Sequence, residues 1–523
     1  MAQVRLGTPA GRWILLATVL GSSVAMLDAT VVNVALPRLA DELGADMAGL
    51  QWTVNAYTLA LAGLILLGGA LGDRYGRRRV FVIGVVWFAV ASLLCGLAQN
   101  VPMLVAARAL QGVGGALLTP GSLAIIQASF APDDRPRAVG AWSGLGGVAG
   151  AIGPFAGGWL VEAAGWRWVF LLNLPLAAVV VLVAVRHVPE SVDPGTHGRF
   201  DVLGAVLAAA TLAGTTYALT EGPASGFGAA VAAATAVGLL SAVAFWWVER
   251  SRGRADGTRD RARADGREIP PMLPLGLFGS RQFSAVNAVT FLVYGGMSVM
   301  FFLLVLDLQV VAGFSPVAAG TALLPVTVLM LLLSSRAGAL AQRIGPRRPM
   351  AVGLLVAAAG MLMASRFGPE TSYVRDVLPA AVVFGLGLSA MVAPLTATVL
   401  ASADERHAGI ASGVNNAVAR AAGLLAVAAV PPLAGLTGDA YRDPGRFADG
   451  YQAALTVCAV LLVAGAALTF AAVRDDVLRA APAAKEPQCR SHCAVGAPPL
   501  EPARASAPGG APPTGASSPR PAG

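Results

Sequence analysis

The sequence predicts an all-α polytopic membrane protein, and three observations support this. Of its 523 residues, 56% are hydrophobic and 13% are charged, a composition that soluble proteins of this length rarely reach. Apolar runs of about 20 residues, long enough to cross a bilayer as helices, recur along the chain. The polar connections between these runs are mostly short. The chain is therefore expected to cross a membrane many times.

Fourteen spans are expected from the positions of the apolar runs. The first run follows Arg5 and Arg12 and is too long for a signal-peptide core, so it is expected to be a span. Two polar segments are long, one at 249–282 and a Pro-, Ala- and Gly-rich tail from 474 that is expected to be disordered. The approximate spans are 13–36, 49–71, 80–98, 104–126, 138–160, 166–186, 202–220, 228–248, 283–308, 317–340, 350–366, 377–400, 407–431 and 451–473.

The positions of the basic residues predict the orientation of the chain. With the N-terminus in the cytoplasm, 28 of the 37 Lys and Arg residues fall in cytoplasmic segments and six in external loops, the bias that membrane proteins show. Both termini are therefore expected in the cytoplasm. The same bias explains the net charge of +8, so no nucleic-acid partner is expected. Lys485 is the only lysine, which indicates a high-GC bacterial genome and hence the bacterial cytoplasmic membrane.

A charged corner, Gly69–Arg79, lies between the second and third apolar runs. It holds one acid and four arginines within seven residues, so it belongs at a membrane edge. Retention of the loop in the cytoplasm alone would explain its arginines. A second role is a latch, in which charged hydrogen bonds to neighbouring helix ends hold a gate shut in one state and release it in another. The residues assigned to this gating loop are Gly69, Gly72, Asp73, Arg74, Gly76, Arg77 and Arg78.

The corner has a copy later in the chain, which indicates an internal duplication. Gly338–Arg348 repeats its pattern 269 residues further on, although Gln342 stands where the corner has Asp73. Asp134 and Glu405, each followed by an arginine, form a second pair at a spacing of 271. Two independent matches near the same spacing favour duplication over chance.

Two six-helix bundles with two inserted helices explain the position of the repeat. The copy follows the tenth span rather than the eighth, so two spans, most simply the seventh and eighth, are inserted between the halves. Two parallel halves around a midplane site are the plan of a transporter. The expected domains are an N-terminal bundle at 1–200, the inserted helices and a basic cytoplasmic loop at 201–282, a C-terminal bundle at 283–473 and a disordered cytoplasmic tail at 474–523.

Several stretches resemble motifs of the major facilitator superfamily, and the fourteen spans resemble its drug/proton antiporter branch. Gly69–Arg79 is similar to the motif between spans 2 and 3, and Leu27–Pro37 is similar to the span 1 motif. Arg108–Gly114 is similar to the span 4 motif, Gly150–Gly158 to the span 5 antiporter motif, and Trp166–Pro175 also looks typical. The resemblance extends from residue 12 to about 473. It implies the major facilitator fold and exchange driven by the proton gradient, without a cofactor.

Asp28 is the first candidate for the coupling chemistry. It lies in an otherwise apolar span, about eight residues and so roughly 12 Å from the outer end. An ionisable side chain at such a depth costs about 2.5–3.5 kcal/mol or more. Its carboxyl group can take up and release a proton, and a cationic substrate would compete with that proton. A structural hydrogen bond between helices is the alternative role.

Arg108 in the fourth span is the second candidate. It lies about five residues from the outer end of its span, close to the depth of Asp28. A buried arginine needs a partner, and this span has no acid. The resemblance implies that an arginine here takes part in proton transfer, so Arg108 is expected to lower the cost of ionising Asp28, directly or through water. An arginine that snorkels to the outer surface is the alternative.

The fifth span carries glycines three or four residues apart, with a proline among them. Such a stripe allows very close helix packing, and Pro154 adds a bend. Tight packing alone would explain the stripe. A bend that seals one side of the pathway is the added functional role, and the resemblance points to exchange. The residues assigned to this antiporter helix are Gly150, Gly153, Pro154, Gly157 and Gly158.

Polar residues within the spans are candidates for lining a substrate pocket. Three acids, at 162, 221 and 307, fall at the outer ends of spans, where a solvated interface position is expected. The one at 307 stands where the family more often has an aromatic or neutral residue, so a role in selecting or releasing a cationic substrate is a further hypothesis. The candidate lining residues are Asp28, Asn55, Tyr57, Gln111 and Asp307.

Other classes of protein fit the sequence less well. The sequence has no phosphate loop, and its four histidines lie in loops, at a span edge or in the tail, so neither an ATP-driven pump nor an enzyme is expected. Cys489 and Cys493 flank His492 in the tail, a weak pattern for a metal site, and no metal is expected.

The sequence therefore predicts proton-driven efflux of amphipathic, lipophilic or cationic compounds, antibiotics among them, by alternating access. The expected partners are a small-molecule substrate, protons and the lipid bilayer, and the expected oligomeric state is a monomer. The alternative is a facilitator or symporter of another small metabolite on the same fold.

Overall fold

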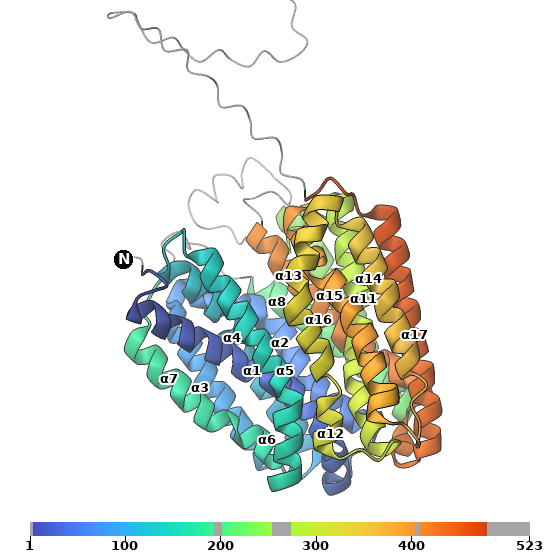
Figure 1. Cartoon of the computed structure of the whole chain (residues 1–523). Coiled ribbons are helices and arrows are strands. Elements are labelled where there is room, and N and C mark those ends of the chain that lie inside the picture. Colours follow the sequence, from blue (N-terminus) through green and yellow to red (C-terminus); the bar gives the residue numbers. More distant parts are fainter. Residues whose placement is uncertain (1–3, 193–200, 254–272, 403–407, 479–523) are drawn as a thin grey trace, which may run out of the picture. The chain divides into compact units, whose positions relative to one another are not determined.

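The apolar runs fold into long helices, as the computed structural model shows (Figure 1). It describes residues 4–192, 201–253, 273–402 and 408–478. In these residues, fourteen helices or helix pairs are long and apolar enough to cross a membrane, which confirms the predicted number of spans. Most of the tail predicted from 474, with its Cys and His residues, lies outside the described residues, as does the central part of the basic loop.

Most spans are single helices that extend beyond the predicted apolar cores. In the first half they are α1 Pro9–Leu43, α2 Met47–Tyr75, α3 Arg77–Gly96, α4 Val101–Ser129, α5 Arg135–Ala164, α6 Arg167–Leu171 and α7 Asn173–His187. The inserted pair is α8 Val202–Ser225 and α9 Ala229–Gly253. In the second half they are α11 Arg281–Val310, α12 Pro316–Thr321, α13 Leu324–Ile344, α14 Arg347–Ala364, α15 Leu378–Ala401, α16 Ala408–Leu433 and α17 Pro444–Ala472. We call the two ends of this helical body the Arg77 end, where α3 begins, and the Trp166 end, where α5 ends.

The sixth span is broken at Leu172, between α6 and α7. Pro175 has no N–H to donate to the carbonyl of Leu171 four residues earlier, and its ring crowds that carbonyl. The proline therefore accounts for the break. It leaves Asn173 at the first position of α7 with a fully buried side chain.

Close helix crossings at paired glycines appear in both halves. Gly84 of α3 and Gly114 of α4 face each other, and a Cβ on either would lie about 3 Å from the other's carbonyl oxygen. Gly353 of α14 and Gly387 of α15 form the same contact in the second half. The matching positions are 269 and 273 residues apart, so the duplication predicted from the charged corners is also present in the packing.

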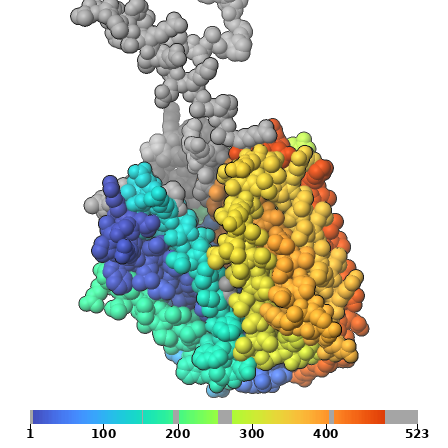
Figure 2. Space-filling model, in the orientation of Figure 1, coloured from blue at the N-terminus to red at the C-terminus, as the bar shows by residue number. Residues whose placement is uncertain are grey.

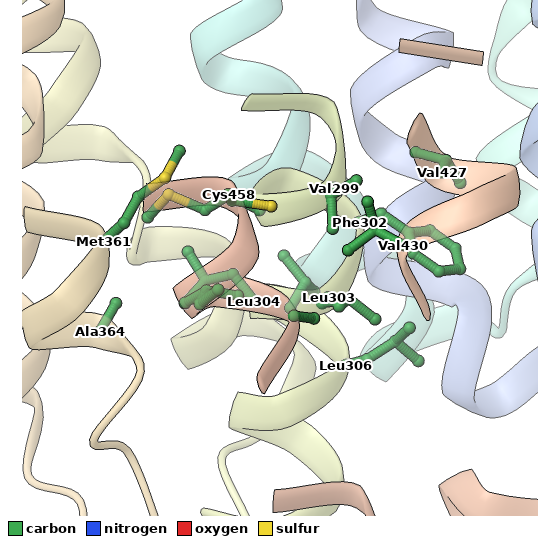
Figure 3. Packing of buried hydrophobic residues seen from close by; sticks show 14 of the residues in the cluster. Val299, Phe302, Leu303, Leu304, Leu306, Met361, Ala364, Val427, Val430 and Cys458 are labelled. Atoms are coloured by element: carbon green, nitrogen blue, oxygen red, sulfur yellow. The ribbon is translucent and has the colours of Figure 1, made fainter. Parts of the chain in front are cut away.

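The core of the second half is built around α11. Figure 3 shows side chains of α11 packed between those of α14, α16 and α17. The labelled residues are Val299, Phe302, Leu303, Leu304, Leu306, Met361, Ala364, Val427, Val430 and Cys458. α11 therefore anchors the neighbouring helices of its half.

The inserted helices form a hairpin that packs against both halves. α8 crosses α9 closely at Gly214 and Gly238, and it also contacts α2 and α16. Asp201, just before α8, forms an ion pair with Arg252 near the end of α9. Burial acts to raise the pKa of Asp201, but hydrogen bonds from Arg252 and from the backbone N–H of Gly204 hold that pKa below its ordinary value. This ion pair ties the two inserted helices together at the Arg77 end.

The charged corner is held by an acid from the segment that follows α7. The carboxylate of Glu190 accepts the backbone N–H groups of Arg78 (3.1 Å) and Arg79 (3.2 Å), and it lies 3.7 Å from the Arg78 guanidinium. Arg77 pairs with Asp73 one turn earlier (2.7 Å). These contacts all lie within the first half, so in this conformation they attach the corner to its own bundle.

The second corner also has an acid, although Gln342 replaces Asp73 there. Asp475, just after α17, accepts the backbone N–H of Arg347 (3.2 Å), as Glu190 does at the first corner. In each half, the acid follows the last helix of that half. The second corner thus lacks the Asp73 counterpart, as the sequence shows, but receives an acid from a distant part of the chain.

The two halves contact each other at the Trp166 end. Gln51 Nε2 donates to the carbonyl of Val427 (2.7 Å), and Gln309 Nε2 donates to the carbonyl of Val34 (3.1 Å). The end of α5 packs against α12 there, and Figure 2 shows these segments meeting near its lower edge. In this conformation the body is therefore closed at the Trp166 end.

Gly76→Ala is expected to lower the free energy of unfolding by about 1–3 kcal/mol. Gly76 has a φ of +112°, which side chains rarely adopt, and its Cβ would lie 2.7 Å from the Glu190 carboxyl group. Gly72→Ala is the matched control, because its Cβ would meet only the Arg77 Cα at 3.9 Å. Thermal unfolding of the purified protein in detergent compares the two. Equal melting temperatures for both variants would contradict this account of the corner.

Candidate functional site

Asp28 lies at the centre of a buried polar cluster in the first half. Its side chain is fully buried near the middle of α1, and its carboxylate accepts three hydrogen bonds. Arg108 Nη1 donates to Oδ2 (2.6 Å), while Gln111 Nε2 (2.8 Å) and Asn173 Nδ2 (2.9 Å) donate to Oδ1. Arg108 and Gln111 are three residues apart on α4, so they share one helix face. The cluster therefore joins α1, α4 and α7 around one carboxylate.

Asp28 also lies further from the end of its helix than the sequence predicts. α1 continues to Leu43, past the predicted end at 36. The side chain is thus fifteen residues from that end of the helix, roughly 22 Å at 1.5 Å per residue. Water at either end of the body reaches this carboxylate only if helices move.

Arg108 is enclosed on all sides, with 1% of its surface exposed. Besides Asp28, its guanidinium donates to the carbonyl of Thr53 (3.0 Å) and to Gln111 Oε1 (2.6 Å). Its Cζ lies 4.5 Å from the centre of the Tyr57 ring, a cation–π contact. The direct contact with Asp28 is therefore present, and the alternative of an arginine that snorkels to the surface is wrong.

Two members of the cluster are not identified by the sequence analysis. Ser92 on α3 accepts hydrogen bonds from Gln111 Nε2 (2.8 Å) and Asn173 Nδ2 (3.3 Å). Asn173 could have been identified from the sequence, since it is a polar residue close to a helix-breaking proline within an apolar span. Ser92 could not, because an isolated serine is common in membrane helices. These two side chains fix the amides that contact Asp28.

The candidate lining residues of α2 and α4 lie near this cluster. Tyr57 and Gln111 both contact Arg108 directly. Asn55 is buried on α2, and its Nδ2 has no hydrogen-bond partner in the described part of the chain. Tyr57 and Gln111 therefore help to enclose the Arg108 side chain of the buried ion pair.

The three acids predicted at span ends occupy different environments. Glu162 is exposed, as expected, and Glu221 accepts a hydrogen bond from Trp52 Nε1 (2.7 Å). Asp307 is fully buried in the second half near Tyr451, and neither carboxylate oxygen has a partner among the described residues. The expected solvated position for Asp307 is wrong, because its side chain is fully buried beside Tyr451 of α17. Asp307 is also not part of the Asp28 cluster.

The antiporter helix α5 uses its glycines for packing mainly at one end. Near the Trp166 end, Gly153 and Gly157 pack against α1, while Gly158 packs against the backbone of Pro316 in α12. A Cβ on Gly150 would meet open space, as would one on Gly140, Gly144 or Gly147, whereas a Cβ on Gly146 would lie 3.2 Å from the Met26 sulfur of α1. The predicted tight packing is therefore present in the half of α5 that closes the Trp166 end.

Duplicated helical halves, fourteen membrane spans and a buried ion pair at mid-helix define a secondary transporter. The model of the Major Facilitator Superfamily matches residues 18–201 and 200–427. The chain belongs to this superfamily, and it is a multi-pass membrane protein.

Its relatives include antibiotic resistance and export proteins. Puromycin resistance protein pur8 of Streptomyces alboniger is 37% identical over 427 residues, covering 80% of this chain and 80% of that protein. The probable actinorhodin transporter of Streptomyces coelicolor is 36% identical over 428 residues, covering 79% and 72%. The multidrug efflux pump LfrA of Mycolicibacterium smegmatis is 34% identical over 410 residues, covering 78% of each.

Solved structures share the fold. A bacterial homolog of the human lysosomal transporter Spinster, inward-facing and unoccupied, has a TM-score of 0.63 at 18% identity and covers 91% of this chain and all of that one. A D-xylose–proton symporter has a TM-score of 0.59 at 16% identity and covers 89% and 98%. At these identities the likeness concerns the fold alone.

Asp28→Asn and Arg108→Gln are each expected to lower the free energy of unfolding by about 3–5 kcal/mol, because each leaves a buried charge without its partner. The double variant is expected to lose less unfolding free energy than the sum of the two single losses. This double-mutant cycle, measured by unfolding in detergent, gives the coupling energy between the two side chains. The same cycle on Glu42 and Arg167, an exposed pair at 2.7 Å, is the control and should give a coupling below about 1 kcal/mol. Additive losses at Asp28 and Arg108 would contradict the ion pair.

Proposed function

We propose that this protein exports amphipathic small molecules, antibiotics among them, in exchange for protons. The observation that carries the proposal is the fully buried Asp28 carboxylate, paired with Arg108 at mid-helix. An ionisable group inside a membrane is costly, and such groups mark proton relays in transporters. The names of the relatives, which describe resistance and export, support efflux as the direction of transport.

Protonation of Asp28 removes the charge that holds Arg108 in place. With a neutral carboxyl group, the guanidinium keeps its bonds to Thr53 and Gln111 but loses its counter-ion. The helices joined by this cluster then lose part of their mutual attraction. A change of a few kcal/mol at such a contact is enough to shift the populations of two conformations.

Direct competition of a cation for Asp28 is not the mechanism we propose. The carboxylate already accepts three hydrogen bonds, and Arg108 occupies the position that a cationic substrate would take. The proton and the substrate are instead proposed to act on each other through movement of the helices that the Asp28 cluster joins.

The closed Trp166 end is proposed to face the outside, with both termini in the cytoplasm of a bacterial cell. The excess of arginines at the Arg77 end supports this orientation. In this orientation the packing of α5 on α12 closes the outer side. The proton gradient is proposed as the energy source, without a cofactor or an enzymatic step.

Asp28→Asn is expected to abolish efflux driven by a proton gradient while the protein still reaches the membrane, because an amide does not take up a proton. Proteoliposomes that contain a pH indicator report whether protons and substrate move in opposite directions. Glu162→Gln, at an exposed acid, is the control and should transport normally. Substrate uptake driven by an inward proton gradient would instead support a symporter of another metabolite, and full efflux by Asp28→Asn would exclude Asp28 as the coupling group.

A further inference from the structure

Arg420 is a cation at membrane depth without a carboxylate partner. It lies in the middle of α16, twelve residues from Ala408 and thirteen from Leu433. Within the described part of the chain, its Nε has no hydrogen-bond partner, and no acid lies within electrostatic range of its guanidinium. A charge at this depth is costly unless it is paired. Its retention therefore needs a ligand or a partner that supplies negative charge.

The titratable groups that act on the charge of Arg420 are tyrosines from two different helices. The hydroxyls of Tyr57 on α2 and Tyr294 on α11 lie within electrostatic range of its guanidinium. Tyr57 also packs against Arg108, so its ring links the buried ion pair to Arg420. Asp28 balances the charge of Arg108 alone. The middle of the body thus holds one more positive charge than negative charge.

A polar stripe on α16 leads to Arg420 from the Arg77 end. Ser412, Asn416 and Arg420 are four residues apart and therefore share one helix face. Ser412 and Asn416 are exposed, and Arg420 is half-buried at the end of the stripe. Contacts between the halves close the Trp166 end, so the stripe leads to Arg420 from the opposite end of the body.

We propose that Arg420 binds an anionic oxygen of the transported molecule, a carboxylate or a phenolate carried on an apolar ring system. The proposal deepens the proposed efflux function and rests on it. The planar guanidinium donates two parallel hydrogen bonds to such a group, and charge-assisted bonds of this kind are about twice as strong as neutral ones. The tyrosines supply aromatic surface for the rings. This substrate class replaces the cationic one predicted from the sequence, because Asp28, the acid of the neighbouring cluster, is already paired with Arg108.

The test uses three probes that differ only in charge: anthraquinone-2-carboxylate, its carboxamide, and the same ring with a trimethylammonium group. Binding to the full-length protein is measured at equilibrium in nanodiscs. The carboxylate is expected to bind at least about tenfold more tightly than the cation, as one charge-assisted interaction predicts. Arg420→Gln is expected to weaken carboxylate binding about 10- to 100-fold and to leave carboxamide binding within about twofold.

Two controls separate this effect from misfolding. Arg336→Gln removes another arginine at membrane depth, one whose side chain is exposed and bonds to its own helix at Leu332, and it should bind all three probes as the wild type does. Arg420→Lys keeps the charge without the planar fork and should give intermediate affinity for the carboxylate. Unchanged carboxamide binding shows that Arg420→Gln is folded.

The outcomes distinguish this inference from the proposed function. Tighter binding of the cation, unchanged carboxylate binding in Arg420→Gln, or no binding of any probe would overturn the role of Arg420. If the carboxylate binds as expected but a proton gradient drives no flux, the efflux proposal is wrong and the binding site remains. If a gradient drives efflux of the cation alone, efflux is supported and the substrate class is wrong.

Discussion

The ion pair between Asp28 and Arg108 is the interaction on which the first half depends. Its two side chains are 0% and 1% exposed, so water does not screen them and neither charge is tolerable alone. The surrounding polar groups follow from this constraint, because the remaining lone pairs and N–H groups of a buried ion pair must also be satisfied. A proton that arrives at Asp28 changes the charge of a site with no solvent to compensate, and the helices around it must respond.

Close helix packing makes the cluster possible. The glycine crossing of α3 and α4 brings Ser92 within reach of Gln111 and Asn173. The second half has the same crossing, but Ser298 and Leu378 stand about 270 residues after Asp28 and Arg108. The duplication therefore supplied the scaffold twice, and the ion pair exists in one copy only. The second half contributes a different charge, Arg420, which has no acid beside it among the described residues.

The spans, the duplication and the charged pair could be predicted from the sequence, because charges are rare in this chain and stand out against apolar runs. Partners that come from distant helices could not. Nothing near Arg347 in the sequence indicates that Asp475 accepts its N–H, and nothing near Asp28 indicates Ser92. The burial of Asp307 could not be predicted either, since the end of an apolar run does not show whether later segments cover that helix end.

The electrostatic interaction between the Asp28–Arg108 pair and an anion at Arg420 limits how proton and substrate can be exchanged. A proton on Asp28 leaves Arg108 without its counter-ion, and a positive charge near Tyr57 attracts an anion at Arg420 rather than expelling it. Antiport requires that the two ligands favour different states, so charge alone does not produce it here. The opposition must come from geometry. Asp28 lies on α1, and α1 packs on the glycines of α5 that close the Trp166 end. We therefore propose that proton and substrate are coupled at the α1–α5 contact. Loss of the ion pair and opening of the Trp166 end both involve α1.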